Sequence, residues 1–532
     1  MKSPSPLWNA KNNIYFLLLI YAAIALFNLD RLPIAWNDEI QNLDPALVWH
    51  NTGFYRSPLW PNPGADIKFL SYPPLLEAWH CIWLYLGKSP FIVRLPFLIF
   101  HLITAVLLHR FVLQILAAPS TNKQPHNPYS QSVVQSLALL ITALFLFDKS
   151  TGEIARSLRV ETPILLLLIT FTTTAYNSFK QPSAFKTLVL GLCLGSLSIA
   201  HLYTWPLVLI AMLLLMNHLA QFKTPTTLRH GFMFLASLLA PIFIFWLTVK
   251  PELHDLKAQL FMQAEDHSGA SPGNNLYGFF IGRFVPYTLE QPYTFFLHLL
   301  YWIAALRLLF TNLAAKSNLS KSSLIPLIYL AFAVPTALFL TPQHRYYPVQ
   351  HLLGLLVIAV YLQNYKPNIA WNPKNRWIKP ALSLIFVVSL ITPWTLRNTA
   401  AILQRSQRNP HTAIQFLNKN LNAIPSGDIL GEPIANYWLA QSPHPKDWQY
   451  GFEFYPQHFP YNAAKPRYFV SRITPKQLPF LFLIDSLNIP TRFAQSQKLG
   501  HTYNGLYLYQ VKSLSAWKRL TNPSTLKITS GH

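Results

Sequence analysis

The sequence predicts a mainly α-helical membrane protein, in which a bundle of about eleven spanning helices precedes a small C-terminal α/β domain. Three observations predict this fold class. Charged residues make up only 11% of the 532 residues, whereas a soluble domain carries about 25%. Apolar runs of about 17 to 25 residues, long enough for a helix to cross a bilayer, recur from Ile14 to Trp394. No such run follows Trp394, which predicts that the rest of the chain lies outside the membrane.

Each predicted span is an apolar run with few charges inside it. A tight hairpin joins the fifth and sixth runs, so a count that differs by about one or two stays open. Lys2 and Lys11 precede the first run as they would in a signal peptide, but no convincing cleavage site follows, which predicts an uncleaved first span. The predicted spans are Asn13–Leu29, Phe91–Leu116, Val133–Phe147, Thr162–Tyr176, Thr187–His201, Tyr203–Leu219, Gly231–Val249, Tyr293–Phe310, Ser323–Thr341, Pro348–Gln363 and Ile378–Trp394.

The charges between the spans predict the orientation. With the N-terminus in the cytoplasm, the predicted inner loops carry lysines and arginines, whereas the predicted outer loops hold most of the acids, as the positive-inside rule requires. This orientation puts the loop at about 30–90, the loop Glu153–Glu161 and the C-terminal domain on one outer, periplasmic or extracellular, face.

The segments outside the spans also carry structural signals. Within the first outer loop, the aromatic stretch Leu75–Leu86 is too short to span comfortably and predicts a helix lying on the membrane surface. We expect two domains, 1–397 in the membrane and 398–532 outside it. In the second domain the sequence predicts a helix and three short strands at His411–Leu421, Asp428–Leu430, Tyr468–Val470 and Gly505–Val511.

The net charge of +23 does not indicate a nucleic-acid partner. Cationic cytoplasmic loops and contacts with lipid phosphates account for much of it, and no nucleic-acid-binding module is recognisable. Cys81 and Cys193 lie far apart in apolar surroundings, without metal-binding spacing, so we expect two buried small side chains.

The pair Asp38-Glu39, just beyond the first span, is the strongest indication of a functional site. Two adjacent carboxylates at a membrane surface are costly to dehydrate, so they suggest a functional role, although two water-facing interfacial residues would look the same. Three further groups fall on the predicted outer face. The first comprises Lys68 and Tyr72, which precede Pro73-Pro74, and the later Arg94. The second comprises Arg156, Arg159 and Glu161, and the third His344, Arg345 and Tyr346.

Each of these groups also has a purely structural interpretation. Arg94 and Arg345 would reach lipid headgroups as snorkelling side chains. Arg156, Arg159 and Glu161 would form a self-neutralising surface cluster. Together, however, the groups suit a chemical site. A carboxylate can take the proton of an acceptor hydroxyl, and arginines can hold a phosphate through bidentate bonds that stabilise its developing charge.

The order of these motifs resembles the GT-C class of integral membrane glycosyltransferases. The order is Asp38-Glu39, Tyr72-Pro73-Pro74-Leu75, Arg94-Leu95-Pro96, Arg156-x-x-Arg159-x-Glu161 and Arg345-Tyr346-Tyr347, and the resemblance covers residues 10–400. It is greatest to the bacterial relatives of protein O-mannosyltransferases and of the lipid A aminoarabinose transferase, in glycosyltransferase family 39. In that family the donor is a polyprenyl-phosphate sugar, and the first outer loop carries the catalytic acid.

The resemblance implies roles for individual residues. Asp38 corresponds to the catalytic aspartate and Glu39 to its neighbour. Arg345 and Tyr346, with Arg94, Arg159 and Arg156, become candidates for the donor phosphate. Glu161, Tyr72, Lys68 and His344 are candidates for the sugar or acceptor pocket. Aminoarabinose transferases have a lysine where Tyr72 stands, which argues against a specific lipid A assignment.

The sequence and the resemblance together predict an inner-membrane enzyme that moves one sugar from a polyprenyl-phosphate donor to a lipid, glycan or protein. Direct displacement at the anomeric carbon would invert its configuration. Asp38 and Glu161 are hard oxygen ligands that suit a divalent metal, although nothing in the sequence demands one. Two alternatives stay open. A lipid-linked sugar flippase would place ionisable residues near the bilayer midplane, where this chain has few. An oligosaccharide polymerase or ligase is not separated by sequence alone.

Overall fold

The computed structural model places most of the membrane part and the elements of the C-terminal part. For a few helix residues, Asp38 among them, only the backbone is described. The described residues are 10–33, 37–57, 68, 70, 75–118, 131–178, 183–201, 204–209, 211–212, 225–267, 292–314, 321–339, 347–365, 394–421, 429–431, 434, 437, 468–471, 475–476, 478–479, 481–487, 489, 506–510 and 512.

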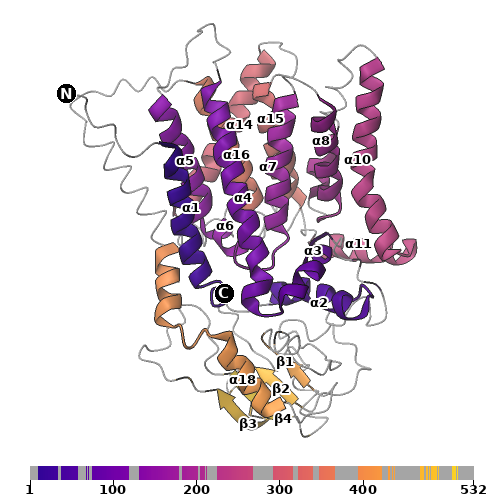
Figure 1. The fold of residues 1–532 in the computed structure, drawn as a ribbon, viewed down its shortest axis with the longest axis vertical. Helices are drawn as coiled ribbons and strands as arrows, with labels where there is room; N and C mark the ends of the chain where they lie inside the picture. The colour runs from indigo at the N-terminus through magenta and orange to yellow at the C-terminus, as the bar shows by residue number, and fades with distance from the viewer. Residues whose placement is uncertain are drawn as a thin grey trace, which may run out of the picture.

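Long helices lie side by side and form a bundle, and a small sheet with one helix lies beyond one end of it (Figure 1). The bundle helices are α1 (Ala10–Phe27), α4 (Pro90–Ala117), α5 (Gln131–Phe147), α7 (Glu161–Ser178), α8 (Ala184–Ser198), α10 (Pro225–Val249), α14 (Pro292–Ala314), α15 (Lys321–Phe339) and α16 (Tyr347–Asn364).

Shorter helices gather at the end of the bundle that faces the sheet, which we call the sheet-side end (Figure 1). They are α2 (Asn37–Thr52), α3 (Leu75–Trp83) with the turn η1 (Leu84–Leu86), α6 (Lys149–Ile154) and α11 (Leu253–His267). The helix predicted at Leu75–Leu86 is confirmed as α3 and η1, and its place on the membrane surface stays a prediction. By contrast, α2 and α11 were not predicted, because their polar residues carry no clear apolar periodicity.

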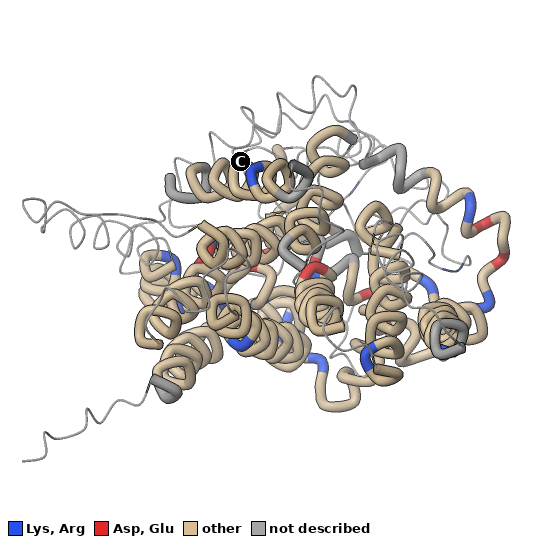
Figure 2. The backbone as a smooth tube through the Cα atoms, turned by 90° about the horizontal axis from the view of Figure 1, so that it is seen from above, with Lys and Arg blue, Asp and Glu red and all other residues tan. Residues whose placement is uncertain are grey.

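Two described helices, Pro90–Ala117 and Arg229–Val249, are long and apolar enough to cross a membrane. The shorter apolar helices Asn13–Phe27, Gln131–Phe147, Ala184–Ser198, Phe296–Thr311 and Ser323–Leu338 coincide with other predicted spans. Figure 2 shows that charged residues are rare along the bundle. The mainly helical architecture is therefore confirmed, whereas the count of about eleven spans stays a prediction. Most of the predicted spans Tyr203–Leu219 and Ile378–Trp394 lies outside the described residues.

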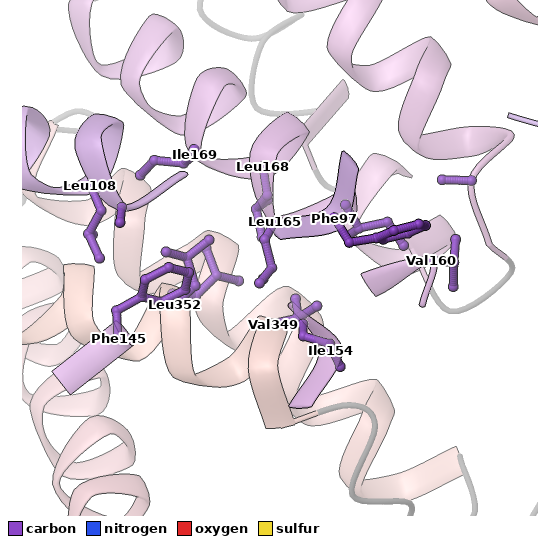
Figure 3. Packing of buried hydrophobic residues seen from close by; sticks show 14 of the residues in the cluster. Phe97, Leu108, Phe145, Ile154, Val160, Leu165, Leu168, Ile169, Val349 and Leu352 are labelled. Atoms are coloured by element: carbon purple, nitrogen blue, oxygen red, sulfur yellow. The ribbon is translucent and has the colours of Figure 1, made fainter. Parts of the chain in front are cut away.

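The centre of the bundle is a close-packed apolar core between α4, α5, α7 and α16 (Figure 3). A glycine allows close helix approach here, since a Cβ on Gly354 of α16 would lie 2.2 Å from the Cδ2 of Tyr301 on α14. Side chains from these helices interlock around α7, namely Phe97, Leu108, Phe145, Leu165, Leu168, Ile169, Val349 and Leu352.

Local capping explains where α4 and α6 begin. The hydroxyl of Ser89 accepts a hydrogen bond from the backbone N–H of Ile92, and Pro90 occupies the first turn, where its missing N–H costs nothing. The carboxylate of Asp148 accepts hydrogen bonds from the backbone N–H groups of Ser150 and Thr151. Such caps satisfy donors that the helix itself leaves unpaired.

The C-terminal part forms a four-stranded mixed sheet with α18 (Pro410–Leu421) packed on it, and we call these elements, together with Ile434 and Tyr437, the C-terminal unit. The strand order is β1 (Ile429–Gly431), β2 (Tyr468–Ser471), β4 (Leu506–Gln510) and β3 (Phe482–Leu487). β1 runs parallel to β2, whereas β4 is antiparallel to both of its neighbours. The predicted helix and three strands are confirmed. β3 was not predicted, and its first three residues are exposed at the edge of the sheet.

Candidate functional site

The pair Asp38-Glu39 lies in the first turn of α2, at the sheet-side end of the bundle (Figure 1). The side chain of Glu39 is completely buried. Asp38 is the second residue of the same helix, and its side chain is outside the described part of the structure. The acidic pair that the sequence singled out therefore forms the second and third residues of α2.

Glu39 forms a buried two-pronged ion pair with Arg94 of α4. Arg94 donates from Nε to Oε1 of Glu39 and from Nη2 to Oε2, each at 2.6 Å. Its Nη1 donates to the backbone carbonyls of Leu29, at 2.9 Å, and Pro33, at 2.7 Å. The guanidinium of Arg94, on α4, thus binds both the segment that follows α1 and the first turn of α2. Planar, bidentate geometry of this kind is specific to arginine.

A tyrosine of the C-terminal part completes the surroundings of Glu39. The hydroxyl of Tyr437 donates to Oε1 of Glu39 at 2.9 Å, and Tyr437 is itself fully buried. These two residues are 398 positions apart in the chain. Sequence reasoning missed Tyr437, since nothing in its local pattern distinguishes it from other aromatic residues.

Arg159 and Glu161 form a second buried pair, between α6 and α7. Arg159 donates from Nη2 to Oε1 of Glu161 at 2.9 Å and from Nε to Oε2 at 3.1 Å. The sequence analysis left open whether these residues neutralise one another or form a site. The structure brings them together, and both are buried rather than at the surface.

Arg156 differs from Arg94 and Arg159 in its hydrogen-bond partners. It is 3% exposed, and it donates from Nη1 to Oδ1 of Asn398 at 2.9 Å and from Nε to the carbonyl of Gly152 at 3.2 Å. Within the described residues no carboxylate bonds to it. Burial lowers the pKa of Arg156, and the positive charge of Arg94 lowers it further, against an opposing contribution from Tyr21.

Neutral polar groups without hydrogen-bond partners in the described structure surround the same region. They are the hydroxyl of Tyr21, both ring nitrogens of His101 and the indole N–H of Trp394, all on buried side chains. The ring of Tyr21 stacks on that of Trp394, with centroids 5.6 Å apart, and lies 5.6 Å from that of His101. This cluster offers hydrogen-bond donors close to an arginine, which is a suitable environment for an anion or for water.

Lys68 lies in a different part of the sheet-side end. Its Nζ donates to the carbonyl of Lys250, at the junction of α10 and α11, at 2.6 Å. Gln259 of α11 donates to the carbonyl of Lys68 at 2.9 Å and accepts the N–H of Leu70 at 2.6 Å. α11 thus holds the loop segment before Pro73-Pro74. Four other predicted site residues, Tyr72, His344, Arg345 and Tyr346, lie outside the described residues.

Glu77 of α3 is a buried carboxyl group that the sequence analysis did not assign to the site. Its Oε2 has no hydrogen-bond partner within the described structure, and burial raises its pKa to about 8. One turn later, burial lowers the pKa of His80 to about 4, although its ring nitrogens lie 3.3 Å and 3.2 Å from the carbonyls of Leu76 and Val93. Its position as a single acidic residue within the apolar stretch Leu75–Leu86 could have identified Glu77 as a candidate from the sequence.

A metal centre stays a prediction. The described residues include no group of three or more His, Cys, Asp or Glu side chains that could hold an ion. Of the two suggested ligands, Glu161 is bound by Arg159, and the side chain of Asp38 is outside the described structure.

The fold matches that of a solved structure over nearly its whole length. ArnT from Cupriavidus metallidurans, in the apo state, superposes with a TM-score of 0.57 at 10% identity, and the match covers 96% of this chain and 99% of ArnT. A second structure of that protein, bound to undecaprenyl phosphate, gives a TM-score of 0.56 at 10% identity, with 95% and 99% covered. The chain therefore has the GT-C membrane fold of ArnT, which confirms the predicted resemblance at the level of fold.

Comparisons of sequence gave no match. No family model matches the chain. No curated protein is significantly similar to it in sequence.

Proposed function

We propose that this protein is a membrane glycosyltransferase that moves one sugar from a polyprenyl-phosphate donor to a lipid, glycan or protein acceptor. The nearly full-length match in fold to ArnT, one structure of which is bound to undecaprenyl phosphate, is the observation that carries this proposal. The active site would lie at the sheet-side end of the bundle, on the periplasmic face of the inner membrane. The bilayer would surround the exposed apolar faces of helices such as α10.

Asp38 is the proposed catalytic base. Glu39 already accepts hydrogen bonds from Arg94 and Tyr437, so its carboxylate is poorly placed to take a proton from an acceptor. Its role would be to anchor the first turn of α2, from which the neighbouring Asp38 would act. A carboxylate held within hydrogen-bond reach of an acceptor hydroxyl would remove its proton as the hydroxyl attacks the anomeric carbon. Direct displacement would then invert that carbon, with the polyprenyl phosphate leaving.

Arg156 is the described arginine best suited to the donor phosphate. Arg94 and Arg159 each bind a carboxylate through two bonds, whereas the described partners of Arg156 are a carbonyl and an amide oxygen. A buried cation without an anion is costly, and a phosphate would both balance its charge and accept its remaining donors. The guanidinium of Arg156 would also stabilise the negative charge that develops on the leaving phosphate. Arg345, Tyr346 and His344 stay proposed partners on the resemblance alone.

Transfer by the purified full-length protein would test this proposal. Radiolabelled polyprenyl-phosphate sugars would be supplied with a membrane extract as acceptor, and the label would be followed into lipid, glycan and protein fractions. We expect Asp38→Asn to lose at least about 100-fold in transfer rate, the size of a general-base contribution. Arg156→Gln should lose about 100-fold, since it removes a charge-assisted contact to the leaving group, and Arg156→Lys should recover part of it.

Arg110→Gln is the matched control, because Arg110 is an exposed arginine on α4. It should transfer at the wild-type rate. Full transfer by both Asp38→Asn and Arg156→Gln would show that the site is wrongly assigned. If folded protein transfers no sugar but moves the labelled donor across vesicle membranes, a flippase would replace the enzyme. Label that moves only as whole oligosaccharides would indicate a polymerase or ligase.

A further inference from the structure

We propose that Tyr437 is a positioning residue, which links the C-terminal unit to the first turn of α2 at the proposed active site. This inference rests on the proposed function, because it concerns how α2 is held for the reaction assigned to Asp38. Its structural basis, however, is independent of any activity. It is the hydrogen bond that joins Tyr437 to the buried pair of Glu39 and Arg94.

The carboxylate of Glu39 receives donors from two separate parts of the chain. Oε1 accepts the Nε–H of Arg94 at 2.6 Å and the hydroxyl of Tyr437 at 2.9 Å. Oε2 accepts the Nη2–H of Arg94 at 2.6 Å. Arg94 holds Glu39 from the bundle side, and Tyr437 holds it from the C-terminal side. All three side chains are fully buried, so water does not compete for these bonds.

Apolar packing supports this contact. Tyr437 and the nearby Ile434 belong to the same continuous cluster of buried side chains as Leu43 and Leu47 of α2. The cluster also includes residues of α18 and of β4. Packing therefore brings the C-terminal unit against the bundle, and the hydroxyl of Tyr437 adds a directional bond at one defined atom. Hydrophobic contact is not directional, whereas a hydrogen bond to a charged acceptor fixes geometry.

The position of Glu39 matters because the proposed base is its chain neighbour. Successive Cα atoms are about 3.8 Å apart, so a shift of the first turn of α2 moves Asp38 with Glu39. A misplacement of about 1 Å at a reacting group can cost about 100-fold in rate. Loss of the Tyr437 bond would leave Arg94 as the one described side chain that bonds to the carboxylate. The first turn of α2 would then move more freely.

Tyr437→Phe is the variant that tests this inference, since it keeps the buried ring and removes the hydroxyl. We expect kcat for sugar transfer to fall about tenfold, while the KM for the polyprenyl-phosphate donor changes less than about twofold. Tyr509→Phe is the matched control, because Tyr509 is another fully buried tyrosine of the C-terminal unit, on β4. It should retain the wild-type kcat. Added to Glu39→Gln, Tyr437→Phe should cause a smaller further loss than it does alone.

Hydrogen exchange on the full-length protein supplies a readout that does not require activity. Tyr437→Phe should speed exchange of backbone amides at the start of α2, whereas amides of β2 and β4 should exchange as in the wild type. Faster exchange throughout the sheet would instead show general loosening of the unit and overturn a positioning role. An active wild type with an unchanged Tyr437→Phe kcat would overturn this inference and leave the proposed function standing. If the wild type transfers no sugar while Tyr437→Phe still loosens α2, the proposed function fails and the structural link remains.

Discussion

At the scale of single residues, the pairing of buried charges distinguishes the arginines of the sheet-side end. Arg94 and Arg159 each face a carboxylate within the described structure, whereas Arg156 faces neutral oxygen atoms. Opposite charges that are removed from water together satisfy one another only in good geometry. Residue type alone does not show which arginine is paired, so all three looked equivalent in the sequence.

The Glu39–Arg94 pair should be important for stability, and its two members should be interdependent. Removing one partner, in Glu39→Gln or Arg94→Gln, leaves a buried charge unpaired and should cost about 3–5 kcal/mol of unfolding free energy. The double variant Glu39→Gln/Arg94→Gln should lose less than the sum of the single losses, because no buried charge remains. Thermal unfolding in detergent would measure this. Strict additivity would contradict the pairing.

The buried carboxyl of Glu77 should make stability depend on pH. Burial raises its pKa from 4.5 to about 8, so between these values the folded protein holds a proton that the unfolded chain has released. The unfolding free energy contributed by Glu77 should therefore fall as the pH rises from about 4.5 to about 8, by up to about 1.4 kcal/mol per pH unit.

Unfolding of the wild type and of Glu77→Gln across this pH range isolates the effect. Glu77→Gln cannot ionise, so the difference in unfolding free energy between the two proteins should shift steadily in favour of the variant as the pH rises. His80, whose pKa burial lowers to about 4, is present in both proteins and cancels in the comparison. A difference that does not vary with pH would show that Glu77 titrates normally.

At the scale of elements, short side chains decide how closely helices approach. α14 and α16 meet where the ring of Tyr301 lies over Gly354. Gly152 of α6, in contrast, could carry a Cβ without a clash, because its nearest neighbour, Cδ1 of Trp394, would lie at an ordinary contact distance of 3.7 Å. These two glycines look alike in the sequence, and only the packing around them distinguishes them.

Alanine substitutions at these glycines should therefore differ in effect. Gly354→Ala places a methyl group 2.2 Å from the ring of Tyr301, so α14 and α16 must separate, at a cost of about 1–3 kcal/mol or more. Gly152→Ala makes ordinary contacts and should change the melting temperature little. Melting of both variants in the same detergent would check this. Equal melting temperatures would mean that α14 and α16 are not packed as the structure has them.

At the scale of the whole molecule, one continuous apolar core joins the bundle to the C-terminal unit. It includes Phe145 and Leu165 in the bundle, Leu47 in α2 and Leu417 in α18. The first turn of α2 lies where the two parts meet, with Glu39 bonded to both. This arrangement makes the C-terminal unit a neighbour of the proposed active site, and the Tyr437→Phe experiment tests whether activity depends on it.

Sequence reasoning found the elements whose patterns are local. Long apolar runs predicted the bundle helices, and local helix and strand signals in the C-terminal part predicted α18, β1, β2 and β4. α2 was missed because Pro45 lies inside it and its polar residues mask a helical period. β3 was missed because its first residues are exposed at the edge of the sheet. At such an edge the sequence need not alternate between apolar and polar residues, so the usual strand signal is absent.

The sequence by itself determined the helical class and the approximate positions of the long helices, and it singled out the acidic pair Asp38-Glu39 as a candidate site. These features depend on composition and short-range pattern, which the chain carries before it folds. Only the tertiary structure decided that Arg94 pairs with Glu39, that Arg156 has no described carboxylate partner, and that Tyr437 reaches Glu39. Such contacts join residues that are tens to hundreds of positions apart. The packing of many helices determines which of them meet, and no local signal specifies it.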